Sequence, residues 1–186
     1  MIVLASASPR RRDLLEQAGI AFRVIPAQIE EWSPDRGEAA AVAEHNARAK
    51  AEAVAAGEPA AVVLGADTVV AKGDRLLGKP LDAAAARSTL RTLSGTTHGV
   101  YTGVAVCYRN QTVSRVVRTD VTMRRLTETE IDEYVASGEA FGKAGAYAVQ
   151  GAAESFVKCL DGPYDNVVGL PVATVRALVA EAGAAL

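Results

Sequence analysis

The sequence predicts a mixed α/β fold, in which one sheet combines parallel and antiparallel strands. In the first third of the chain, short apolar segments alternate with helical segments, which indicates parallel strand–helix units. Between residues 61 and 123, strand-like segments follow one another across short turns, which indicates antiparallel hairpins. Of the 186 residues, 49% are hydrophobic and 23% are charged. This balance excludes a disordered chain and suits one domain, residues 1–186.

The first strands and helices can be placed from the residues that begin and end them. Residues 2–5 form a short apolar strand. Ser8 is a favourable N-cap for the helix that follows, Pro9 suits its first position, and Gly19 ends it. The next elements are a second strand, a polar loop and an alanine-rich helix, at residues 22–26, 30–37 and 38–56.

The remainder of the chain adds the antiparallel strands and three further helices. Asp82 can cap one helix, and Thr127 with Glu130 forms a capping box for another. Three glycines predict a loop over residues 142–151. Strands are predicted at residues 61–66, 69–72, 75–77, 98–108, 112–123 and 155–160, and helices at 82–93, 127–137 and 171–182.

Charge, cysteine content and hydropathy exclude several classes of function. The net charge of −2 argues against a broad nucleic-acid-binding surface, which needs clustered Lys and Arg. Cys107 and Cys159 form no CxxC pair, so we expect buried strand residues in a reducing compartment and neither a zinc site nor a disulfide framework. No apolar run approaches the ~20 residues that a membrane span needs. We therefore expect a cytoplasmic protein without membrane or nucleic-acid partners.

The segment from Ser6 to Arg11 has the composition of a phosphate-binding turn. It joins the first strand to the first helix, and a helix N-terminus offers free N–H groups and partial positive charge. Ser6 and Ser8 add hydroxyl groups, and Arg10 and Arg11 add planar guanidinium groups that match phosphate oxygens. The alternative is an ordinary capped helix with solvated arginines, because the segment is not a P-loop.

Two acidic positions are candidates for metal binding or proton transfer. Asp67 directly follows the apolar strand at residues 61–66, and ligands of α/β folds bind at the carboxyl ends of strands. An aspartate there can bind Mg²⁺ or accept a proton from water. Glu31, in the polar loop beside Glu30, could supply a second oxygen ligand. The alternatives are a turn-forming aspartate and a solvated acidic pair.

Further cations and one amide could contact the same ligand. Lys79 lies in a Gly-Lys-Pro turn, Lys143 and Gln150 lie in the glycine-rich loop, and Lys50 lies on the alanine-rich helix. Each of these side chains could instead be merely solvated. A Ser–His–Asp triad lacks support, since no GxSxG motif is present. Taken together, the residues suit a polyanionic ligand with a divalent metal, and a nucleotide phosphate chain fits best.

The order of these motifs resembles the Maf family of nucleoside triphosphate pyrophosphatases. The resemblance runs from residue 4 to residue 171. Each motif is weakly specific by itself, but six or more in the same order are specific. The matching blocks are Leu4-Ala5-Ser6-Ala7-Ser8-Pro9-Arg10-Arg11, Glu30-Glu31, Gly65-Ala66-Asp67-Thr68-Val69-Val70, Gly78-Lys79-Pro80, Ser94-Gly95 with His98, Lys143-Ala144-Gly145-Ala146-Tyr147 with Gln150-Gly151, and Val168-Gly169-Leu170-Pro171.

The resemblance implies a two-lobed α/β fold with an elongated mixed sheet, flanking helices and a cleft between the lobes. It implies hydrolysis of a nucleoside triphosphate between the α and β phosphates, with Mg²⁺ or Mn²⁺ as cofactor. It also implies a cytoplasmic location and a homodimer. The physiological task would be removal of unwanted nucleotides from the pool.

The resemblance also assigns roles to residues of this chain. Asp67 would activate water and, with Glu31, hold the metal, and three positions would govern substrate choice: Arg10, Thr68 and Gln150. The Asp-Thr pair and the Gln-Gly block resemble the branch that acts on dTTP and UTP, in contrast to the branch that acts on 7-methyl-GTP. The other matching site residues are Ser6, Ser8, Arg11, Lys50, Lys79 and Lys143.

Two alternatives from other classes stay open at the level of sequence. One is a nucleotide-binding regulator of septum formation or cell division, in which catalysis is secondary. The other is a phosphatase that uses the same anion cradle for a different substrate and releases orthophosphate.

Overall fold

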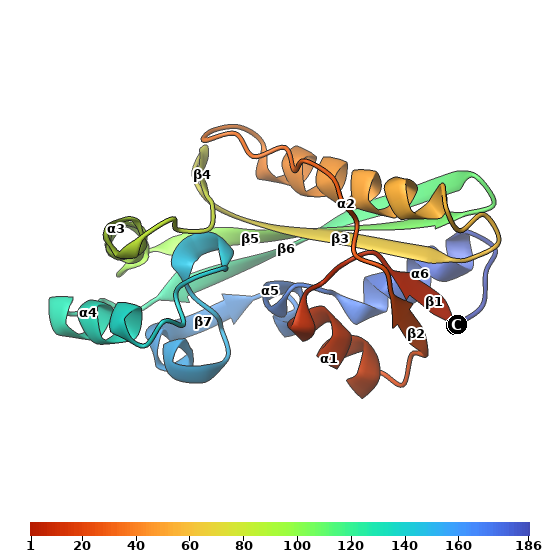
Figure 1. Ribbon diagram of the computed structural model, residues 1–186. Coiled ribbons are helices and arrows are strands. Elements are labelled where there is room, and N and C mark those ends of the chain that lie inside the picture. Colours follow the sequence, from red (N-terminus) through yellow and green to blue (C-terminus); the bar gives the residue numbers. More distant parts are fainter.

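The computed structural model describes residues 1–186 and contains one seven-stranded sheet flanked by helices (Figure 1). The strand order is β2-β1-β3-β5-β6-β7, with β4 paired to a different part of β3. The pairs β1–β2 and β1–β3 are parallel and all other pairs are antiparallel, which confirms the predicted mixed sheet. The strands are β1 (Ile2–Leu4), β2 (Phe22–Val24), β3 (Val63–Lys72), β4 (Arg75–Leu77), β5 (Thr97–Tyr108), β6 (Gln111–Met123) and β7 (Val157–Asp161).

Helices cover both faces of the sheet. The longest helix, α2, runs along one face of β3 and β5, and α6 packs on β5 and β6 from the other side (Figure 1). At one end of the long strands lie α3 and α4, and α1 lies with β1 and β2 toward the other end. The helices are α1 (Pro9–Gln17), α2 (Ala39–Ala55), α3 (Ala83–Leu93), α4 (Glu128–Ala136), α5 (Tyr164–Val168) and α6 (Val172–Glu181), with short 3₁₀ turns η1 (Ala144–Ala146) and η2 (Gly151–Phe156).

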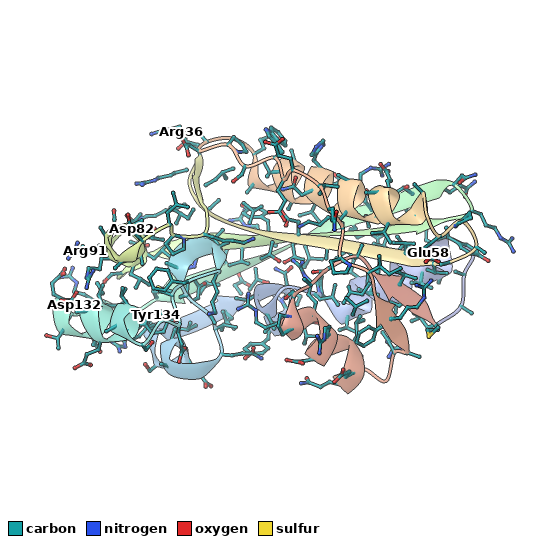
Figure 2. All side chains as sticks on the ribbon, viewed as in Figure 1. Arg36, Glu58, Asp82, Arg91, Asp132 and Tyr134 are labelled. Atoms are coloured by element: carbon teal, nitrogen blue, oxygen red, sulfur yellow. The ribbon has the colours of Figure 1, made fainter.

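Three long strands, β3, β5 and β6, give the molecule its elongated shape (Figure 1). One apolar cluster, which includes Leu90, Met123 and Ile131, lies at the α3 and α4 end. Two further clusters lie at the opposite end, one on each face of the sheet. Ion pairs Arg91–Glu128 and Arg87–Asp132 join α3 to α4 at the surface, and Figure 2 shows Arg91 and Asp132 at this end.

Two glycines allow α2 to approach the sheet closely. A Cβ atom on Gly65 would lie 2.2 Å from the carbonyl oxygen of Ala47, and one on Gly103 would lie 2.2 Å from that of Ala43. Alanines of α2 face these glycines and are fully buried. Because only hydrogen atoms separate the two backbones, side chains of α2 near these alanines come within reach of β3.

Two expectations about single elements were wrong, and one short helix was missed. The strands predicted at residues 61–66 and 69–72 form one continuous strand, β3, because the polar pair Asp67 and Thr68 finds hydrogen-bond partners inside the fold. Cys159 is exposed, since β7 is an edge strand, whereas Cys107 is buried as expected. Helix α5 was not predicted, because its five residues are too few to show a helical period.

None of the helices combines the length and hydropathy that crossing a membrane requires.

Candidate active site

A cleft of about 570 Å³ opens beside the middle of β3. Its lining comes from segments that lie far apart in the sequence, namely the turn after β1, the loop after β2, α2, β3, and the loops before and after η1. Every site residue expected from the sequence lines this cleft: Ser6, Ser8, Arg10, Arg11, Glu31, Lys50, Asp67, Thr68, Lys79, Lys143 and Gln150.

The sheet topology leaves a gap in strand pairing where the cleft lies. Strand β1 pairs with only two residues of β3, Val63 and Leu64, and β4 begins to pair at Val70. Residues 65–69 of β3 therefore have no strand partner on this edge. Asp67 was expected at the end of a strand, but it lies in the middle of β3, three residues beyond Leu64, which pairs with the last residue of β1. The strand whose carboxyl end lies at the cleft, as is usual for ligand sites in α/β folds, is therefore β1 and not β3.

Asp67 is buried, and both of its carboxylate oxygens have partners from α2. The ammonium group of Lys50 donates to Oδ1 at 2.7 Å, and the amide of Asn46 donates to Oδ2 at 3.0 Å. Lys50 and Asn46 are four residues apart on a helix, so their side chains leave the same face. This pair fixes the orientation of the carboxylate in the cleft.

Glu31 is joined to the same lysine from the opposite side. Its Oε1 lies 2.6 Å from Nζ of Lys50, and its Oε2 lies 3.9 Å from Nζ of Lys79. Burial by itself would raise the pKa of the Glu31 carboxyl group, but the hydrogen bond and charge of Lys50, with Lys79 and Arg11, leave that pKa below its ordinary value. Glu31 therefore contributes a negative charge to the cleft at neutral pH.

Arg11 is a buried guanidinium group that braces three segments of the site. It donates to the carbonyl oxygen of Gly169 at 2.8 Å, to Ser6 Oγ at 3.0 Å and to Thr68 Oγ1 at 3.1 Å. Burial lowers the pKa of Arg11, and the charge of Asp67 opposes that effect. Each of the three nitrogens is used within the protein, so Arg11 fixes the walls of the cleft.

The N-terminus of α1 faces the cleft with unused polar groups. Ser8 is the N-cap, as predicted, but its side chain makes no capping hydrogen bond. Its backbone N–H donates to Ser6 Oγ at 3.3 Å. Arg10, in the first turn, is partly buried and makes no hydrogen bond or ion pair within the protein. The hydroxyl of Ser8 and the guanidinium of Arg10 are thus free for an anion.

Thr68 points away from α2, to the opposite face of the sheet from Asp67. Its hydroxyl accepts from Arg11 and lies 3.0 Å from the hydroxyl of Thr102 on β5. Thr102 in turn donates to the carbonyl of Asn166 on α5. The hydroxyl of Thr68 is therefore engaged in a polar chain that links the cleft to α5.

The far wall of the cleft is the loop that carries Lys143 and Gln150. Lys143 donates to the carbonyl oxygen of Glu139, and burial, followed by the charge of Arg10, lowers its pKa. Gln150 is exposed and makes no hydrogen bond within the protein, so its amide is free for a ligand. Tyr147 is buried, and its hydroxyl lies 2.7 Å from Nε2 of His98, which anchors the loop to β5.

The structure adds Asn46 and Phe141 to the site, and it gives a contact to Gly169, which the sequence marked only as part of a matching block. Asn46 bonds Asp67, and the carbonyl group of Gly169 bonds Arg11. Phe141 is a partly exposed aromatic ring in the cleft wall. The i, i+4 spacing from Lys50 could have indicated Asn46. A backbone carbonyl and a loop aromatic carry no such signal.

The donor set suits a divalent metal that shares its ligands with a substrate. The structure contains no group of three or more His, Cys, Asp or Glu side chains that could hold a metal ion. Glu31 and Asp67 provide two hard carboxylates, both paired with Lys50. Mg²⁺ is commonly held by one or two carboxylates plus substrate phosphates and water, which this pair fits.

An elongated mixed sheet with a cationic cleft at an interrupted strand edge defines an α/β protein suited to a polyanionic ligand. The family model for Maf-like protein matches residues 1–182. This chain therefore belongs to the Maf family.

Relatives within the family are similar over nearly their whole length. A dTTP/UTP pyrophosphatase of Pelotomaculum thermopropionicum is 50% identical over 184 residues, covering 98% of this chain and 96% of the relative. A dTTP/UTP pyrophosphatase of Bacillus cereus is 47% identical over 171 residues, covering 92% of this chain and 90% of the relative. A third, from Bacillus cytotoxicus, has the same identity and coverage.

Proposed function

We propose that this protein hydrolyses dTTP and UTP between the α and β phosphates, giving the nucleoside monophosphate and pyrophosphate. The observation that carries the proposal is the pair of carboxylates, Asp67 and Glu31, held on one lysine in a cleft lined by further cations. The similarity to dTTP/UTP pyrophosphatases over nearly the full chain supports the substrate class.

The triphosphate would be bound by the free polar groups of the cleft. Ser8, Arg10 and the first turn of α1 provide donors that have no partner within the protein. Lys79 and Lys143 would neutralise further phosphate charge. Positioning and electrostatic stabilisation of the phosphates account for most of the rate gain in phosphoryl transfer.

Asp67 is the proposed general base for the attacking water. Its carboxylate is held by Lys50 and Asn46, so its orientation toward a bound phosphate is set before substrate arrives. Glu31 and Asp67 would also hold Mg²⁺ or Mn²⁺, which supplies charge neutralisation on the phosphate oxygens. Because Lys50 pairs with both carboxylates, metal binding would compete with this ammonium group for the same oxygens.

The base of the nucleotide would be selected at Gln150. Its unpaired amide offers one acceptor and two donors, which can match the edge of a pyrimidine. Phe141, on the same loop and in the same cleft wall, provides an aromatic surface beside it. A 7-methyl-GTP pyrophosphatase is the alternative within the family.

The variant Asp67→Asn tests the assignment of the base. We expect the turnover number with UTP to fall by about 10²–10⁴-fold, the usual contribution of general acid–base catalysis. Binding of UTP, measured by calorimetry, should survive because the phosphate-binding groups Ser8 and Arg10 are unchanged. The new amide keeps the shape of the side chain but can accept from only one of Lys50 and Asn46. Asp74→Asn, at the exposed turn after β3, is the matched control. Near-normal turnover in Asp67→Asn would remove Asp67 from the mechanism.

A further inference from the structure

The loop that carries Glu31 has almost no hydrogen bonds of its own. It connects β2 to α2, and between residues 26 and 34 no backbone group bonds to another backbone group. The backbone of this segment is held by one side chain. Asn46 Oδ1 accepts from the N–H of Trp32 at 2.9 Å, and Asn46 Nδ2 donates to the carbonyl oxygen of Trp32 at 3.0 Å.

The same amide also holds Asp67. Nδ2 of Asn46 donates to Oδ2 of Asp67 at 3.0 Å, so both N–H bonds and the oxygen of this amide are used. Asn46 is 3% exposed. A buried amide with every group paired has one orientation, because turning it would leave buried polar groups without partners.

We propose that Asn46 is a positioning residue that sets Glu31 and Asp67 relative to each other. Trp32 is the neighbour of Glu31, so fixing both backbone groups of Trp32 holds the backbone position from which the Glu31 side chain extends to Lys50. The remaining N–H holds Oδ2 of Asp67, which leaves Oδ1 to Lys50. This inference rests on the function proposed above, in which Glu31 and Asp67 act together.

The alternative explanation is that Asn46 only stabilises the fold. The two roles differ in what a substitution changes. A structural residue alters the free energy of unfolding alone. A positioning residue alters turnover and the surroundings of Trp32 in a protein that is still folded.

Trp32 gives a direct readout of the loop. It is the only tryptophan in the sequence and its side chain is about half exposed, 49%. Its ring packs edge-on against His45, with ring centroids 5.5 Å apart. Fluorescence emission and acrylamide quenching therefore report on this segment alone.

Two variants separate the contacts of Asn46. Asn46→Leu keeps the number and branching of the side-chain heavy atoms and removes all three hydrogen bonds. Asn46→Asp keeps the acceptor for the N–H of Trp32 but places a second carboxylate against Asp67. Glu44→Gln is the control, because Glu44 lies on the same helix and bonds Ser114 on β6, away from the cleft.

We expect Asn46→Leu to lower kcat for UTP by about 10–100-fold, the usual effect of losing a group that orients metal or catalytic ligands. KM should change by less than about threefold, because the phosphate-binding groups are untouched. Acrylamide should quench the fluorescence of Trp32 more strongly than in the unmodified protein. The Mg²⁺ concentration that gives half-maximal activity should be higher. Asn46→Asp should lose at least as much kcat with a smaller change in quenching.

Circular dichroism shows whether each variant is folded. Folded variants with unchanged kcat and unchanged quenching would overturn the inference, and so would loss of folding in both. If the unmodified protein hydrolyses no nucleotide, the proposed function fails. The quenching difference between Asn46→Leu and Glu44→Gln then still decides whether Asn46 holds the loop.

Discussion

Lys50 is the residue on which the two acidic groups of the cleft converge. Its ammonium group lies 2.6 Å from Glu31 and 2.7 Å from Asp67, and only 10% of its side chain is exposed. With Arg10, Arg11, Lys79 and Lys143, the cleft holds five cationic side chains against these two carboxylates. The excess of positive charge favours a polyanion and would raise its rate of association.

His98 makes the stability of the protein sensitive to mild acid. Burial, and then the charge of Lys72, lowers the pKa of His98 to about 4, whereas its unfolded value is about 6.5. As the pH falls from about 6.5 to about 4, the unfolded chain takes up a proton that the folded protein excludes. The free energy of unfolding should therefore fall by about 1 kcal/mol per pH unit across this range.

Urea denaturation of His98→Gln between pH 4.5 and 7.5 measures this contribution. We expect the variant to have a flatter dependence of unfolding free energy on pH than the unmodified protein. His45→Gln, at the only other histidine and on the exposed side of α2, is the control. Identical curves for all three proteins would contradict the assignment.

At the level of residues, the sequence was sufficient to predict which side chains form the candidate site, because phosphate binding depends on residue type. Serines, arginines and lysines beside glycines and at a helix start were recognisable, and the structure brings all of them to one cleft. The partners of those groups were not predictable. Arg11 bonds Gly169, and the two lie 158 positions apart, so only the folded chain shows that this arginine braces the walls.

Helix α2 delivers both Lys50 and Asn46 to the site because it lies unusually close to the sheet. Gly65, two residues before Asp67, faces the backbone of α2, and so does Gly103, the cross-strand partner of Asp67. A larger residue at either position would push the helix away from β3. The hydrogen bonds from α2 to Asp67 depend on this spacing.

Gly65→Ala tests the close approach. We expect the free energy of unfolding to fall by about 1–3 kcal/mol, the usual cost of inserting a methyl group into a packed interface. Turnover should fall as well, because displacement of α2 would lengthen the contact between Lys50 and Asp67.

Gly57→Ala is the control for this experiment. A Cβ atom there would meet its nearest neighbour, the carbonyl oxygen of Val54, at an ordinary 3.7 Å. Chemical denaturation and steady-state kinetics measure both effects. A Gly65→Ala protein as stable and as active as Gly57→Ala would contradict the claim that the site depends on the close approach of α2.

The elements themselves were predictable to different degrees. The alanine-rich helix, the capping box of α4 and the two long strands β5 and β6 follow from periodicity and end signals. The continuity of β3 did not, because a buried Asp-Thr pair resembles a turn until its partners are known. Those partners come from α2, α1 and β5, which lie at a distance in the sequence.

At the scale of the whole molecule, the long strands β3, β5 and β6 extend from one end of the molecule to the other. The cleft lies along β3, between the two ends. The α3 and α4 end has its own apolar cluster, and the opposite end has two. Shared strands keep the turn after β1 and the loop of Lys143 and Gln150 at a fixed separation. That one domain spans residues 1–186 stays a prediction.

Hydrolysis of UTP and dTTP in ¹⁸O-labelled water with Mg²⁺ tests the central claim most directly. The account predicts pyrophosphate without label, one labelled oxygen in the nucleoside monophosphate, and little turnover of purine triphosphates. This result would place the attack of water at the α phosphorus. Release of orthophosphate alone, or label in pyrophosphate, would contradict the proposed reaction.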